Sequence, residues 1–523
     1  MINNKKILIL FLTFFFLLIT KTDYRFIENI YCCKDDHDYY IHAETIAIDF
    51  DLDYTNQLTG NLKDRFYKEG TSAPSGFIGT GIFSAPFLFV GNILNKLLNQ
   101  NDNIFNFRIL AYSMSSVMYL FFSIFLMNKI MKLLKVKNNL PLITITFLGS
   151  GVSYFAFERY SMSHVYEIFS ITCIMYFTVR YHLAEKTGKF TFLIALSVLL
   201  AILTKWVHLY VLFIPYIVEC VSRDRINIKK SIYKDVRYQL SLIFSFIVFC
   251  VLSISVYGSL VFNPQVVYET SNVVSSYFSN QNLGDLLISN LKAVLKIFFG
   301  QEFGLIWFNP ILLIGTIIAF SYMFTTKYNP FFKILILISF SQIFGIVLLW
   351  QSTASSYGYR YLLNLVPMSL LLFFTSSYSE KKYILIYLKL FSIFGIIGVV
   401  FFEASIGTQL SVDYQLNSFG IERPFVNSKY LSGLLNSVTE LDSYLKIFST
   451  SFLGALIFKF ILMFIKPDIF IEFLIANNLP GDNIDFQSLL YSVYQIPLFN
   501  FLFVSVIYLI ICKYIIQKSI IKA

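Results

Sequence analysis

The feature that most constrains this chain is a succession of apolar stretches, since a helix needs roughly 20 mostly apolar residues to cross a bilayer. Hydrophobic residues make up 56% of the 523 residues and charged residues only 14%. A chain of this composition lacks the polar surface that a water-soluble protein needs. The sequence therefore predicts an all-α polytopic membrane protein.

Twelve membrane-spanning helices are predicted, with thirteen as the alternative. The segment 7–19 follows two lysines, as the apolar part of a cleaved signal peptide does, but no small-residue cleavage site follows it, so an uncleaved first span is favoured. The segment 446–465 has Lys459 at its centre and gives the thirteenth span if it crosses. The twelve predicted spans lie near 7–20, 107–128, 140–157, 161–180, 190–204, 206–221, 239–262, 303–324, 331–350, 361–379, 383–402 and 498–517.

Lysine and arginine clusters between these stretches predict the orientation. They fall in alternate short connections, as the positive-inside rule expects of cytoplasmic loops, and they explain the net charge of +10 better than nucleic-acid binding does. The apolar segment 76–98 would reverse this pattern if it crossed, so we expect it to lie in the outer interface or to re-enter. Residues 21–106, 263–302 and 403–497 then lie outside the inner (cytoplasmic) membrane. We expect a catalytic module over 1–400 and a C-terminal segment over 401–523.

The first outer loop is acidic in a basic chain. Between residues 21 and 73 there are eleven Asp or Glu and six Lys or Arg. Asp35, Asp36 and Asp38 form its tightest cluster, beside Tyr39 and Tyr40. Crowded carboxylates near an apolar surface raise one another's pKa, which is one way to prepare a general base. The alternative is a hydrated acidic loop without a catalytic role.

A second acidic pattern follows, in which Asp49, Asp51 and Asp53 alternate with apolar side chains. A period of two is typical of an extended segment with one polar face. Carboxylates on that face are candidate ligands of a divalent cation, because hard cations bind carboxylate oxygens. A solvated acidic strand edge is the alternative, and the spacing does not distinguish the two.

Single polar groups at the ends of spans are further candidates, because ionisable residues in membranes are costly and often functional. His164 and Glu167 are one helical turn apart at the start of the fourth span, where a local pair of Arg159 with Glu158 and a hydrogen-bonded His164 is the structural alternative. For Lys205 the alternative is a snorkelling lysine. Arg360 suits a phosphate but also ordinary interfacial anchoring. Glu302 lies beside a Trp and a Pro where a span begins.

Several common cofactor sites are excluded by the lack of their motifs. The chain has no Walker loop, no dinucleotide-binding fingerprint and no HExxH helix. An outward-facing site has no access to cytoplasmic nucleotides, so an activated group would have to arrive on a lipid. We expect no cofactor other than a possible divalent cation.

Short motifs in order along residues 30–370 resemble the GT-C superfamily of polytopic glycosyltransferases, and most closely its bacterial family-39-like branch. The first loop matches at Asp36, Tyr39 and Tyr40 and then along 48–56, although Phe50 stands where relatives often have Gly and Lys205 where they often have Arg. The later matches are Pro74, Gly76, Pro86, Phe87, Met162, Ser163, His164, Gly304, Leu305, Pro310, Gly358, Arg360 and Pro367.

The resemblance implies transfer of a sugar from a polyprenyl-phosphate carrier to a cell-envelope acceptor at the outer membrane face, with inversion at the sugar carbon. It implies a first-loop carboxylate as general base, for which Asp36 is favoured over Asp35 and Asp38. Arg360 and Lys205 would bind the phosphate. The remaining expected substrate contacts are His164, Tyr39, Tyr40 and Glu302. A transporter or lipid flippase and an O-antigen polymerase are the competing functions.

Overall fold

The computed structural model describes the chain over most of its first 400 residues. The described residues are 2–20, 34–58, 67–68, 71–97, 107–136, 140–184, 187–228, 230–262, 283–300, 303–350, 358–402 and 506–511. The predicted segment 446–465, most of the predicted C-terminal segment and Glu302 lie outside these residues.

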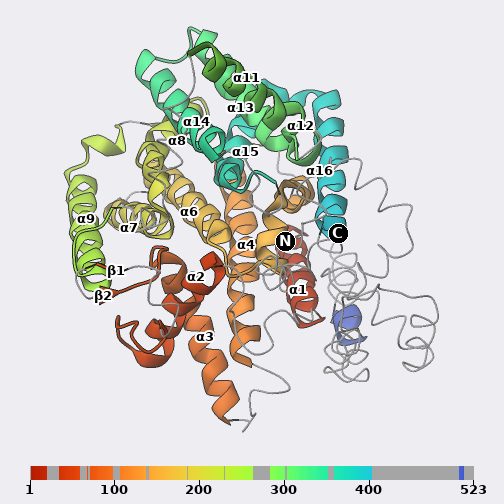
Figure 1. Ribbon diagram of the computed structural model, residues 1–523. Coiled ribbons are helices and arrows are strands. Elements are labelled where there is room, and N and C mark those ends of the chain that lie inside the picture. The colour runs from red at the N-terminus through yellow and green to blue at the C-terminus, as the bar shows by residue number, and fades with distance from the viewer. Residues whose placement is uncertain are drawn as a thin grey trace.

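The described part is almost entirely helical (Figure 1). Two strands of two residues each, β1 (Tyr67–Lys68) and β2 (Thr71–Ser72), pair in antiparallel fashion. The longer helices are α1 (Ile2–Thr20), α2 (Lys34–Glu44), α3 (Gly79–Leu97), α4 (Phe107–Leu133), α5 (Leu140–Phe147), α6 (His164–Leu183), α7 (Gly188–Thr204), α8 (Ile214–Ser222), α9 (Val236–Tyr257), α11 (Leu283–Phe299), α13 (Pro310–Phe324), α14 (Pro330–Trp350), α15 (Val366–Thr375) and α16 (Lys382–Phe402). The short helical segments are η2 (Thr45–Asp49), η4 (Leu148–Val152), η5 (Tyr154–Glu158), η6 (Trp206–Phe213), η7 (Ile232–Lys234), α12 (Leu305–Phe308), η9 (Arg360–Leu365) and η10 (Ser377–Glu380).

Three described helices are long and apolar enough to cross a membrane: α4, α9 and the Lys382–Val400 part of α16. Six shorter apolar helices of 10–17 residues accompany them. These helices indicate an all-α membrane protein. The count of twelve or thirteen spans stays a prediction, because only these three meet the criteria of length and composition.

Several predicted spans are broken helices, and a glycine or a proline marks each break. The span predicted at 140–157 consists of α5, η4 and η5, and Gly151 within it has a φ of 87°, which only glycine adopts without strain. Prolines occupy the first turns of α8, α13 and α15, where the missing N–H costs no hydrogen bond. These breaks divide the predicted spans into shorter helical pieces.

The core is centred on α4 and α6, which cross the middle of the molecule (Figure 1). Leu120 and Ile124 of α4 and Ile168 and Ile171 of α6 are fully buried in one hydrophobic cluster. On one side α7 packs against α6 and then α9 packs against α7, and on the other side α13, α15 and α16 complete the bundle. The stretch 506–511 lies against α1, where Tyr508 stacks on Phe16 at 4.6 Å between ring centroids.

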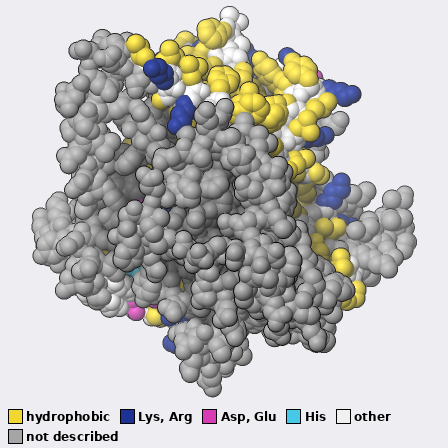
Figure 2. Space-filling view, turned by 45° about the vertical axis from the view of Figure 1, so that its right-hand side comes forward, with side chains coloured by type: hydrophobic (Ala, Val, Ile, Leu, Met, Phe, Trp, Pro, Cys, Tyr) yellow, Lys and Arg dark blue, Asp and Glu magenta, His cyan; other side chains and the backbone are white. Residues whose placement is uncertain are grey.

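The outer surfaces of several helices are hydrophobic, as expected of helices that face lipid. Figure 2 shows hydrophobic side chains spread over the upper part of the described surface, with Lys and Arg side chains among them. Exposed examples are Phe244 on α9, Phe320 on α13, Ile334 on α14 and Leu390 on α16. This surface supports the assignment of the chain to membranes.

The extended acidic segment predicted over 47–54 is wrong. Residues Thr45–Asp49 form the helical turn η2, and Phe50 then takes a left-handed conformation with φ of 61° and ψ of 33°. The period of two arose by chance, because turns, not sheet pairing, set this backbone. The predicted interfacial segment 76–98 contains α3, which packs along α2 and α4 and is not among the three long apolar helices.

Candidate functional site

The acidic cluster lies on α2, and two of its three carboxylates are buried. Asp36 and Asp38 are each 1% exposed, whereas the Asp35 side chain is 27% exposed. Asp35 and Asp36 occupy the first turn of α2, where carboxylates interact favourably with the helix dipole. The alternative of a hydrated acidic loop is therefore wrong for Asp36 and Asp38.

Asp36 joins α2 to the connection between η5 and α6. The Arg159 guanidinium donates two hydrogen bonds to Asp36 Oδ2, from Nε at 2.9 Å and from Nη2 at 2.6 Å, and Ser161 Oγ donates to the Asp36 carbonyl. Arg159 is thus paired with Asp36, where the sequence had suggested a pair with its neighbour Glu158. Burial raises the pKa of Asp36, and the adjacent Arg159 charge acts in the opposite direction.

Asp38 points away from this ion pair and binds the segment before α3. Its Oδ2 accepts hydrogen bonds from the backbone N–H of Ser75, at 3.2 Å, and from the Ser75 hydroxyl. The next carbonyl, that of Gly76, accepts from His42 Nε2 and from the Tyr257 hydroxyl, both at 2.8 Å. Asp38 therefore fixes a strap over residues 73–81, which ties α2 to α9.

The strap can lie this close only because it contains glycines. A Cβ on Gly76 would lie 2.6 Å from the Tyr39 ring. A Cβ on Gly79 would lie 2.4 Å from the backbone carbon of Leu203, at the end of α7. The strap is therefore wedged between Tyr39 and the residues that immediately precede Lys205.

His42 predicts a pH dependence of stability. It accepts from the Tyr54 hydroxyl at Nδ1 and donates to Gly76 from Nε2, and burial lowers its pKa from 6.5 to about 4. A folded-state pKa below the unfolded value stabilises the protein at neutral pH, and this contribution is lost as the pH falls from 6.5 to about 4. Denaturation at pH 5 should therefore show about 2 kcal/mol less unfolding free energy from His42 than at pH 7.

The control for this prediction is His42→Gln, which cannot bind a proton but keeps a side-chain amide. The difference in unfolding free energy between pH 7 and pH 5 should shrink by that amount in the variant. An unchanged pH dependence would show that His42 is not responsible.

A second group of charges meets where α7 ends and where α6 and η9 begin. Lys205 is only 5% exposed, so the expectation of a snorkelling lysine is wrong. Its Nζ lies 3.9 Å from Glu167 Oε1 and 4.3 Å from the centre of the Tyr361 ring. His164 Nδ1 lies 3.4 Å from Glu167 Oε2, and Ser163 donates a hydrogen bond to the same carboxylate. Glu167 is therefore the shared anion of this group.

Arg360 connects the second group to α2. Its Nη1 lies 3.6 Å from Asp35 Oδ2, and its guanidinium lies 5.2 Å from the centre of the Tyr361 ring. Arg360 and Lys205 thus share one aromatic ring as a cation–π partner. Arg360 Nε is buried and has no hydrogen-bond partner in the described part of the chain, although a buried unpaired donor is costly. An anion at this position would satisfy it.

Two adjacent tyrosines of α2, Tyr39 and Tyr40, lie in different surroundings. Burial raises the pKa of Tyr39 well above its ordinary value, and the nearby Asp35 and Glu167 charges add to this effect, so Tyr39 stays a neutral hydroxyl beside the cluster. Tyr40 instead accepts a hydrogen bond from Arg108 at 3.4 Å, and Arg108 forms an ion pair with Glu44 at 2.6 Å. The predicted tyrosine pair is therefore divided between the cluster and a separate contact with α4.

The structure brings together six of the residues predicted from the sequence. Asp38 and Tyr40 lie on other faces of α2, and Glu302 lies outside the described residues. Arg159 and Glu167 were only secondary candidates in the sequence and Tyr361 was not predicted, although an isolated charge in an apolar stretch is a usable signal. The six residues brought together are Asp35, Asp36, Tyr39, His164, Lys205 and Arg360.

The three alternating carboxylates do not converge on a metal position. Asp51 and Asp53 accept backbone N–H groups two residues ahead of them, at 3.1 and 3.0 Å, and so form turns. Asp49 accepts from the Asn56 side chain at 3.1 Å. No group of three or more His, Cys, Asp or Glu side chains that could hold a metal ion occurs in the part of the chain that the structure describes. The carboxylates are explained by local turn formation.

No family model, no curated protein and no solved structure matches the chain. The site must therefore be interpreted from its own chemistry.

Proposed function

We propose that the chain transfers a sugar from a polyprenyl-phosphate carrier to a hydroxyl of a cell-envelope acceptor. The observation that carries this proposal is the arrangement of Arg360, Lys205 and Asp35. The buried Lys205 and the largely buried Arg360 share the Tyr361 ring, Arg360 has one buried N–H with no partner among the described residues, and a partly exposed carboxylate lies 3.6 Å from Arg360. The transferase needs an anion site beside a base, and these residues supply both.

In the proposed reaction the acceptor oxygen attacks the anomeric carbon while its proton passes to a carboxylate. The bond between that carbon and the phosphate oxygen breaks, and the electron pair leaves with the lipid phosphate. Arg360 and Lys205 stabilise the charge that develops on the phosphate, as preorganised cations do in other transfer reactions. Attack from the face opposite the phosphate inverts the sugar carbon.

The structure favours Asp35 over Asp36 as the base. Asp36 Oδ2 is occupied by two hydrogen bonds from Arg159, and Asp36 is buried, so it positions α2. Asp38 is occupied by Ser75. Asp35 is the most exposed of the three, and its neighbour is a phosphate-binding candidate, so an acceptor hydroxyl can reach it.

The location of the charges supports an enzyme more than a transporter. Transporter sites lie near the bilayer midplane, often in helices broken at that depth. Here Lys205 follows the last residue of α7, His164 is the first residue of α6 and Arg360 is the first residue of η9. A site at helix ends suits a substrate whose head group lies at the membrane surface.

The finer architecture belongs to the same proposal: a GT-C-like bundle of twelve spans in the inner membrane, with the site on its outer face. The exposed residues Thr55 and Asn56 then lie outside, and Lys230, exposed between α8 and α9, lies inside. In intact cells, a cysteine in place of Thr55 should react with a membrane-impermeant maleimide, and a cysteine in place of Lys230 should react only after lysis. The reverse result would overturn the orientation.

The function is tested by supplying the purified full-length protein with radiolabelled polyprenyl-phosphate sugars and extracted envelope lipids and glycans. Sugar transfer, or slow hydrolysis of the donor without an acceptor, is the expected result. Movement of an intact lipid-linked sugar across proteoliposome membranes, without cleavage of any donor, would replace the transferase by a flippase.

A further inference from the structure

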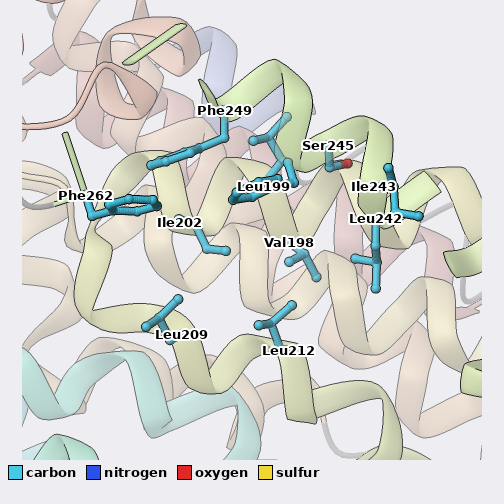
Figure 3. A pocket seen from close by; sticks show the side chains of 11 residues that line it. Val198, Leu199, Ile202, Leu209, Leu212, Leu242, Ile243, Ser245, Phe249 and Phe262 are labelled. Atoms are coloured by element: carbon cyan, nitrogen blue, oxygen red, sulfur yellow. The ribbon is translucent and has the colours of Figure 1, made fainter. Parts of the chain in front are cut away.

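An apolar groove lies between α7, η6 and α9, on the side of α7 away from the partners of Lys205. Its cavity volume is about 500 Å³, and side chains from the three elements point toward one another across it (Figure 3). The lining contains no charged residue, and its one polar side chain is Ser245. The lining residues are Val198, Leu199, Ile202, Leu209, Leu212, Leu242, Ile243, Ser245, Phe246, Phe249 and Phe262.

The groove has a buried floor and an exposed rim. Val198 and Phe249 are buried at 1% and 5%, whereas Ile243 and Phe246 are each at least half exposed. Most of the rim belongs to α9, one of the three described helices that can span a membrane, and Leu209 of η6 is also exposed there. In a bilayer, the surroundings of this opening are hydrocarbon, so the groove is accessible to lipid chains.

One end of the groove is positively charged. There the first residues of α7 and α9 meet, and Arg237 Nη2 donates a hydrogen bond to Thr187 Oγ1 at 2.7 Å. Three basic residues, Lys189, Lys234 and Arg237, are exposed at this end. Asp235 forms an ion pair with Arg237, and this pair does not include the two lysines. The remaining positive charge complements an anionic head group.

The α9 side of the groove begins within one leaflet of this charged end and reaches just past the bilayer midplane. Leu242 and Phe249 follow Arg237 by five and twelve residues on α9, which places them about 7 and 18 Å along the helix axis. Half of a hydrocarbon core is about 15 Å thick. A head group at Arg237 therefore puts its chain at the depth of the groove.

The volume of the groove is too small for a protein helix of several turns. One turn of a helix about 10 Å wide fills roughly 400 Å³, so the groove would hold little more than one turn. A single flexible hydrocarbon chain fits a narrow space of this size. We propose that this groove binds one acyl chain of an anionic phospholipid, whose phosphate is held by Lys189, Lys234 and Arg237.

Bound lipid would hold α9 against α7. The described part of α9 packs mainly on α7, and its end donates the Tyr257 hydrogen bond to Gly76 in the strap beside Tyr39. The lipid site is independent of the proposed transfer reaction, because its lining and its charged end include none of the residues assigned to that reaction.

The test uses phosphatidylglycerol and phosphatidylcholine that each carry a photoreactive diazirine in one acyl chain. After irradiation of the purified full-length protein, mass spectrometry should locate the label in α7 and α9. Phosphatidylglycerol should label these helices about tenfold more than phosphatidylcholine, and Lys189→Ala with Lys234→Ala should abolish the preference. Lys381→Ala with Lys382→Ala, a matched pair of exposed lysines at the start of α16, should leave it unchanged.

Ser245→Phe should fill the groove and reduce labelling of both lipids, and Leu209→Trp at the exposed rim serves if the first variant does not fold. Label spread evenly over all lipid-facing helices would overturn the site. Equal labelling by the two lipids would overturn the head-group assignment. If a photoreactive polyprenyl phosphate labels the groove and the two phospholipids do not, the occupant is the hydrocarbon chain of the sugar donor.

Discussion

Asp35→Asn is expected to lower the turnover number of sugar transfer about a thousandfold, while the protein stays folded and still binds the donor. A positioned general base contributes about 10² to 10⁴ in rate, and Asn keeps the shape of Asp but cannot take a proton. The measurement is initial rate at saturating donor, with binding of the labelled donor followed separately. KM for the donor should change little, because Arg360 and Lys205 remain.

Two matched variants make this result specific. Asp51→Asn removes an exposed carboxylate of a local turn and should leave the rate unchanged. Asp36→Asn should lower the unfolding free energy, because it weakens the buried pair with Arg159. An active Asp35→Asn protein, together with a folded but inactive Asp36→Asn protein, would return the role of base to Asp36.

Arg159→Met is expected to lower the free energy of unfolding by about 3–5 kcal/mol, the usual cost of leaving a buried charge without its partner. Asp36 would keep its burial but lose both hydrogen bonds from the guanidinium. Denaturation in detergent, followed by circular dichroism, measures the change. The variant should lose less stability at acidic pH, since burial raises the pKa of Asp36 and a protonated carboxyl needs no cation.

The double variant Arg159→Met with Asp36→Leu distinguishes the ion pair from general packing. Replacement of both charges by apolar groups removes the unpaired charge, so the double variant should be more stable than Arg159→Met alone. If the losses of unfolding free energy in Arg159→Met and in Asp36→Leu add up to the loss in the double variant, the two side chains are not energetically coupled. The ion pair would then not be what holds α2 in place.

The helices were largely predictable because apolar composition alone marks them. Each of the first eleven predicted spans overlaps described helices, from α1 to α16, although their breaks at Gly151 and Pro310 were not predicted. The acidic turn at 45–53 was not predictable from its alternation, since its conformation depends on side-chain acceptors such as Asp51 and Asp53. Local hydrogen bonds there outweigh the tendency of alternating residues to form strands.

Individual site residues could be nominated from the sequence, but their contacts could not. Lys205 and Arg360 each had an ordinary explanation at a membrane surface, and only the fold brings both against Tyr361. Asp36 and Arg159 are 123 residues apart in the chain, so no local pattern predicts their hydrogen bonds. The division of labour among Asp35, Asp36 and Asp38 likewise depends on which partner each one meets.

The strap over residues 73–81 has a consequence for biosynthesis. The Gly76 carbonyl accepts a hydrogen bond from Tyr257, and Asp35 on the neighbouring α2 lies close to Arg360. The N-terminal residues of the site therefore make these contacts only after much later residues have been translated. At about 5–20 residues per second, roughly 15–65 s pass between synthesis of Asp35 and of Arg360. During this time Asp35 lacks its final partner, so we expect the nascent chain to bind insertion factors that shield polar groups at the membrane.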